Sequence, residues 1–174
     1  MPMPRMTVKT FCWVVAIVSL PVLRLQTLAG QQVHILHDAS VQIQRVEPDW
    51  VFTPWVCNFR GPLLSEQVGI DCGSWNPRDE PLVSRDAVLV HLHVVSSAEA
   101  ASRWMTERLK RDNSPQGWTT MPYEIGDGGY LATYERAETY ELAFRKARFL
   151  IFVGARAKMN AERFARRLAS IDFE

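Results

Sequence analysis

The most regular hydrophobic pattern of the chain begins at residue 88. Residues 88–95 read Val-Leu-Val-His-Leu-His-Val-Val, which is apolar throughout on one face and mixed on the other. A short apolar run of this kind predicts an inner β-strand. Ser96 and Glu99 then have the spacing of a capping box, and apolar residues recur at helical intervals over 97–111. The pattern therefore predicts a strand followed directly by a helix.

Three further strands are expected over residues 130–134, 139–145 and 149–153. Short polar breaks separate the last two from their predecessors, as is typical of hairpins. Residues 118–128 are expected to form a loop, which ends in the tight turn Gly126-Asp127-Gly128-Gly129. A last helix is predicted over 160–171, because Asn160 is a favourable cap and an apolar stripe follows it.

Residues 31–81 have a different pattern. Residues 33–46 contain the strictly alternating segment Val41-Gln42-Ile43-Gln44, which predicts strands. Residues 48–81 are rich in Pro, Gly and Trp, so we expect an irregular segment with one or two short strands. The predicted domain therefore has an N-terminal region of strands and loop over 31–81 and a core over 82–174.

These elements predict an α+β fold. The order β–α–β–β–β–α follows the N-terminal region, and each helix has one apolar stripe. We therefore expect an antiparallel sheet with the two helices packed on one of its faces.

Residues 1–30 have the three regions of a secretory signal. Arg5 and Lys9 precede an uncharged, mostly apolar run over 11–23, and small residues follow near Ala29. The run is shorter than the roughly 20 apolar residues of a membrane span. The sequence thus predicts a cleaved signal and a secreted or periplasmic protein. An uncleaved N-terminal anchor remains the alternative, and it would be the only contact with a membrane.

The net charge argues against one class of partner. Loss of residues 1–30 would leave 17 Lys and Arg against 19 Asp and Glu. A nucleic-acid-binding domain normally has a strong basic excess, so no nucleic acid is expected as a partner.

Two cysteines remain after cleavage, Cys57 and Cys72. In an oxidising compartment an even pair predicts a disulfide, here closing a loop of about 15 residues. A redox or metal-binding pair would need a different spacing, since neither a C-x-x-C motif nor a nearby histidine at zinc spacing is present.

The C-terminal half resembles small exported α+β domains of bacteria, many of them uncharacterised and some similar to PsbP-like lipoprotein domains. The resemblance covers residues 87–172 and rests on Gly126-Asp127-x-x-Tyr130, on Phe144-Arg145-Lys146 and on the helix containing Phe164. These domains usually have a glycine at the second hairpin, where this chain has Ala147. The resemblance implies binding of a ligand or a partner protein and not catalysis.

His91 and His93 are the candidate metal ligands. They are two residues apart in the predicted strand, so both imidazoles point to the same face. Such a pair can ligate a metal, but histidines in a strand are more often ordinary half-buried or solvent-facing residues. His34 and His37 would lie on opposite faces of an extended strand.

Tryptophans are the candidate binding residues. Trp50, Trp55 and Trp75 lie near the cysteines, and aromatic side chains are common on binding surfaces as well as in cores. No motif of a nucleophilic hydrolase or a phosphate-binding loop is present in the sequence, and no cofactor is predicted. We therefore expect a non-enzymatic binding or accessory protein of the bacterial envelope, whose partner is an unidentified protein or small molecule. A metal-dependent hydrolase that uses His91 and His93 is the alternative.

Overall fold

The computed structural model describes residues 34–57, 66–80, 84–112, 118–134 and 137–173. The predicted signal at residues 1–30 lies outside these ranges. Within them, no helix is long and apolar enough to span a membrane.

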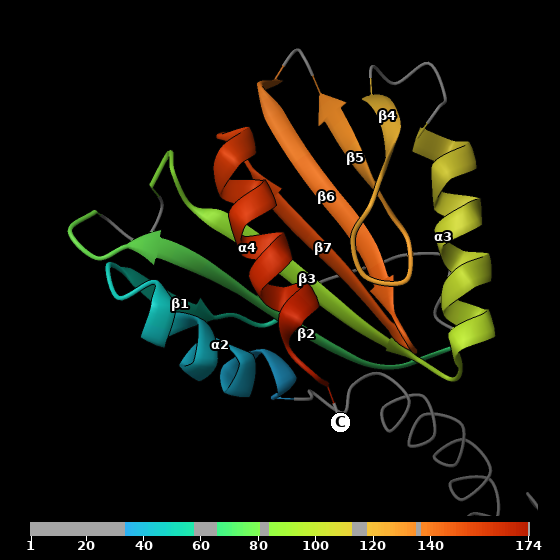
Figure 1. Cartoon of the computed structure of the whole chain (residues 1–174), viewed down its shortest axis with the longest axis horizontal. Coiled ribbons are helices and arrows are strands. Elements are labelled where there is room, and N and C mark those ends of the chain that lie inside the picture. The colour runs from blue at the N-terminus through green and yellow to red at the C-terminus, as the bar shows by residue number, and fades with distance from the viewer. Residues whose placement is uncertain (1–33, 58–65, 81–83, 113–117, 135–136, 174) are drawn as a thin grey trace, which may run out of the picture. The chain divides into compact units, whose positions relative to one another are not determined.

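One antiparallel sheet of seven strands organises the described residues, with the strand order β1-β2-β3-β7-β6-β5-β4 (Figure 1). The strands are β1 (Trp50–Pro54), β2 (Gln67–Pro77), β3 (Val88–Val95), β4 (Trp118–Tyr123), β5 (Gly129–Tyr134), β6 (Thr139–Lys146) and β7 (Phe149–Ala155). The antiparallel α+β class is thereby confirmed. The long strand predicted at 88–95 is β3, and the three C-terminal strands correspond to β5, β6 and β7.

The helices cover both faces of the sheet. On one face, α2 (Ile35–Val46) and α4 (Lys158–Ser170) pack against residues such as Ile151 and Val153 of β7. On the other face, α3 (Ala98–Asp112) packs against Leu150 and Phe152 of the same strand. Figure 1 shows α2 and α4 apart from α3. The expectation that both predicted helices share one face is wrong, because β7 is apolar on both sides and each side requires its own cover.

The element order contains one more strand than predicted. From β3 onward the order is β–α–β–β–β–β–α, because Trp118–Tyr123 forms β4 where a loop was expected. β4 is an edge strand, and all of its residues are exposed or half-buried. Pro122 is tolerated there because an edge strand leaves part of its backbone unpaired. Such a strand lacks the apolar alternation that identifies buried strands.

The N-terminal segment predicted as strands is helix α2. Leu36, Ala39 and Ile43 recur at helical spacing and are buried against the sheet. The alternation at residues 41–44 does not reflect burial, because Val41 is 47% exposed. The apolar residues at intervals of three and four therefore determine the structure of this segment, and the period-two pattern does not.

The helix ends differ by a residue or more from those predicted. Ser97, one position after the expected Ser96, caps α3 because its Oγ accepts the N–H of Ala100 at 3.1 Å. The N-cap of α4 is Ala157, which makes no side-chain cap bond, so Asn160 lies inside the helix.

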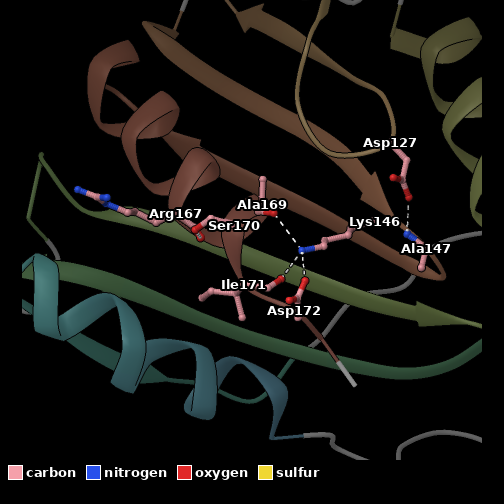
Figure 2. A network of polar contacts seen from close by, with 8 residues as sticks. All are labelled: Asp127, Lys146, Ala147, Arg167, Ala169, Ser170, Ile171 and Asp172. Carbon is pink, nitrogen blue, oxygen red and sulfur yellow. Dashed lines mark hydrogen bonds and ion pairs between the residues drawn. The ribbon is translucent and has the colours of Figure 1, made fainter.

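Lys146 of β6 stabilises the other end of α4 (Figure 2). Its Nζ donates to the carbonyl oxygens of Ala169 and Ile171, at 3.1 and 2.5 Å, and lies 3.1 Å from the carboxylate of Asp172. A cation is favourable at this position because the last carbonyls of a helix carry partial negative charge.

Candidate functional site: a pocket on the α3 face

A cavity of about 360 Å³ opens on the sheet face that carries α3. Its lining combines residues from β2, β3, β4, β6 and β7 with residues that follow β1, precede β3 and follow β7. Ligand pockets typically measure about 300–1,000 Å³, so this one is large enough for a small organic molecule.

The floor is a row of register partners across four strands. Glu141 of β6 lies opposite Gly154 of β7, which lies opposite Leu89 of β3, and Leu89 lies opposite Ser74 of β2. Gly154 has no side chain to fill the middle of this row. A Cβ placed on Gly154 would find its nearest neighbour, the carbonyl oxygen of Tyr140, at 4.0 Å. The glycine therefore opens the hollow although neither a steric contact nor a positive φ requires it.

Two indole rings line the pocket from opposite parts of the sheet. Trp55 follows β1, and its ring centroid lies 6.2 Å from that of His91. Trp118 begins β4, and its ring stacks on Tyr134 with 5.2 Å between centroids. Both indoles are half-buried, so they present aromatic surface to the cavity.

The disulfide holds Trp55 in place. Cys57 and Cys72 are joined as predicted, with their Cα atoms 5.7 Å apart. The N–H of Trp55 also donates to the carbonyl oxygen of Cys72 at 3.1 Å. Because Cys72 is the register partner of His91, these two links fix the segment containing Trp55 beside the pocket floor.

Three charged residues line the pocket. Glu141 accepts a hydrogen bond from Arg108 of α3 at 3.0 Å, and both side chains are largely buried. Arg85 precedes β3 and Arg156 follows β7, so the antiparallel pairing of these strands places both arginines at the same end. Both are exposed, and the pocket therefore has a cationic end.

His91 also lines the pocket, and burial lowers its pKa, with a smaller contribution from the positive charge of Arg108. Because its pKa is lowered, the imidazole of His91 is neutral at neutral pH. His91 is therefore a neutral polar group in a mostly apolar wall.

His93 lies on the same sheet face, as predicted, but it is buried beneath α3. Its ring centroid is 5.8 Å from Trp104 and 5.5 Å from Phe152, and its Nδ1 is 3.0 Å from Oε1 of Gln67. Burial lowers its pKa to about 4, and electrostatic interactions with His91 and Arg108, which disfavour a second positive charge there, lower the pKa further. The two histidines thus share a face but not an environment.

The described part of the fold brings no third candidate ligand to His91 and His93. Across the described ranges, no group of three or more His, Cys, Asp or Glu side chains is arranged so that it could hold a metal ion. His34 lies just before α2 and His37 lies within it, rather than on a strand.

The three predicted tryptophans lie in different places. Trp50 and Trp75 belong to the core on the α2 and α4 face, where their ring centroids lie 4.8 and 5.1 Å from that of Phe164. Trp75 is only 1% exposed. Of the three, the structure brings only Trp55 to the pocket.

Sequence reasoning missed Trp118, Gly154, Arg85 and Arg156 as site residues. Trp118 stood in a segment expected to be a loop, and the other three carry no recognisable motif. These four residues come together in the structure because of the strand register, and their spacing along the chain does not reveal that register.

The chain matches no family model, and it has no significant match to a curated protein or to a solved structure. The resemblance to exported bacterial domains therefore remains an expectation from the sequence. The pocket itself provides apolar surface, two indoles and a cationic end, which together are suited to binding a small molecule.

Proposed function

We propose that the protein is an exported, non-enzymatic binding protein that holds a small, largely apolar molecule in the pocket on the α3 face. The observation that carries this proposal is Gly154. A central strand position on a covered sheet face is normally filled by a side chain, because protein interiors are close-packed. Here the position is left empty between Trp55 and Trp118, and no backbone constraint explains the absence.

Export is the second part of the proposal. It is supported by the signal-like pattern of residues 1–30 and by the disulfide between Cys57 and Cys72. Disulfides persist mainly in oxidising compartments such as the periplasm or the extracellular space.

A size series at Gly154 tests the binding role. The probe is N-phenyl-1-naphthylamine, a neutral apolar dye whose fluorescence rises when it leaves water. Gly154→Ala, Gly154→Val and Gly154→Leu place one, three and four carbon atoms into the cavity. We expect a progressive loss of affinity, of at least about tenfold for Gly154→Val.

The stability of the same variants is the control. The nearest atom to a Cβ at this position is 4.0 Å away, so the substitutions meet no backbone clash. Side chains also suit a strand better than glycine does, and the midpoint of thermal unfolding should therefore stay equal or rise. Unchanged dye affinity in the folded Gly154→Leu variant would overturn the proposal.

A further inference from the structure

The cationic end of the pocket indicates what kind of ligand the protein accepts, and this inference rests on the proposed binding function. Arg85 and Arg156 come from different segments, but the pairing of Leu89 with Gly154 brings the ends of β3 and β7 together. Both arginines line the cavity beside its apolar floor. Guanidinium groups are planar donors that bind carboxylates and similar anions through paired hydrogen bonds.

In the described part of the chain, acidic groups pair only weakly with the two arginines at this end. Glu141, the acidic residue of the lining, is engaged by Arg108 from α3. Arg85 pairs with Glu138 at 3.4 Å, but both side chains are more than 70% exposed. An ion pair that is so exposed contributes little and yields readily to a better partner. Among the described residues, Arg156 forms no ion pair.

The remainder of the cavity favours a flat apolar group. Phe152 and Leu89 contribute apolar surface to the floor, and Gly154 adds no side chain at its own position. Trp55 and Trp118 add aromatic faces at the two sides. Aromatic groups gain from offset or edge-to-face contacts with such rings, beyond the area that they bury.

We infer that the ligand is a small organic anion with a flat apolar body, held with its anionic group at Arg85 and Arg156 and its body above Gly154, between Trp55 and Trp118. The distance from the floor row to the strand ends is short, since Gly154 and Arg156 are two residues apart. A single anionic group attached directly to one or two fused rings matches this arrangement.

The test compares two probes of the same shape. 2-Naphthoate and 2-naphthamide have the same ring system and the same number of non-hydrogen atoms, but only the first is an anion. Calorimetric titration of the wild-type protein at pH 7 should give an affinity for 2-naphthoate at least about tenfold above that for 2-naphthamide. The preference should decrease as salt is added, because the arginines are exposed.

Variants then locate the charge effect. Arg85→Gln and Arg156→Gln should each reduce the affinity for 2-naphthoate several-fold and leave that for 2-naphthamide nearly unchanged. Arg148→Gln is the matched control, since this exposed arginine precedes β7 at its opposite end. It removes the same charge without touching the pocket, and both affinities should stay as in the wild type.

The outcomes separate the two proposals. Equal affinities for the two probes, unaffected by Arg85→Gln and Arg156→Gln but abolished by Gly154→Leu, would overturn the anion inference and leave the binding function standing. Absence of binding by either probe and by the neutral dye would overturn both. An equal loss of 2-naphthoate affinity in Arg148→Gln would also contradict the inference, because the effect would then be one of net charge.

Discussion

The carboxylate of Asp71 accepts a hydrogen bond from the backbone N–H of Leu36, with 2.8 Å between Oδ2 and N and 35 positions between the residues. His34, at the N-cap of α2, provides no side-chain cap bond. A buried residue of β2 therefore takes over the role that a local cap usually has. It also fixes the start of α2 against the sheet.

Asp71→Ala should lower the free energy of unfolding by about 1–3 kcal/mol, because the N–H of Leu36 loses its acceptor inside the protein. Asp71→Asn keeps an acceptor oxygen and should cost less. Urea unfolding measures the difference, and amide exchange should accelerate first in α2. Equal stabilities of Asp71→Ala and the wild type would show that α2 does not depend on this bond.

The hairpin between β6 and β7 contains a strained residue. Ala147 has a φ of +50°, in the left-handed region that favours glycine, and its N–H donates to Oδ2 of Asp127 at 2.6 Å (Figure 2). Ala147→Gly removes the strain without removing the bond, so we expect a gain of up to about 1 kcal/mol in the free energy of unfolding. Ala147→Val is the opposing control and should destabilise, because a β-branched residue tolerates this region poorly. A lower free energy of unfolding in Ala147→Gly would show that Ala147 is not strained.

Burial of His93 makes stability depend on pH. Its pKa is about 4 in the folded protein, against 6.5 as the ordinary value. The unfolded chain therefore binds the proton at a higher pH than the folded protein does. The stabilisation is fully present above pH 6.5 and is lost as the pH falls from 6.5 towards 4, with a magnitude of about 3 kcal/mol.

His93→Gln isolates this effect. The variant keeps Asp71, whose pKa burial raises, and His91, whose pKa burial lowers, so both proteins share those contributions. The free energy of unfolding of the wild type should fall more steeply than that of the variant between pH 6.5 and 4. Parallel curves, measured by urea unfolding at each pH, would contradict a neutral buried His93.

Reduction of the disulfide should affect both stability and the pocket. A closed loop of about 15 residues corresponds to roughly 3 kcal/mol, so Cys57→Ser should lower the free energy of unfolding by about that amount while the sheet persists. The variant keeps the backbone hydrogen bond from Trp55 to Cys72 but loses the covalent link of the segment that contains Trp55, so the affinity for 2-naphthoate should fall as well. The intact mass of the exported protein should be about two hydrogens below that of the reduced form. Free thiols at both positions in exported protein would contradict the bridge.

Local patterns predicted the strands and helices that bury a regular face. β3 and α4 each keep one apolar face over several residues, β7 is a continuous apolar run, and the structure contains all three. The start of α2 depends on Asp71, far away in the sequence, and its residues 41–44 alternate as a strand would. The same segment also contains the helical spacing of Leu36, Ala39 and Ile43, so the prediction of strands rests on giving the alternation more weight than that spacing.

The sequence predicts less of the candidate site than of the fold. Trp55 was identified because it is aromatic and near a cysteine, but the same argument selected Trp50 and Trp75, which are core residues. Gly154 is recognisable as a pocket residue only when its register partners, Glu141 and Leu89, are known. A pocket assembled from several strands requires the pairing to be known first.

The NMR spectrum of the indole N–H groups during titration with 2-naphthoate reports directly on whether the ligand enters the pocket. Signals are assigned with single Trp→Phe variants. We expect the signals of Trp55 and Trp118 to shift progressively, while those of Trp50 and Trp75, on the opposite face of the sheet, stay in place. Shifts confined to Trp50 and Trp75, or no shift at Trp55 and Trp118 under conditions in which the probe binds, would contradict a binding pocket on the α3 face.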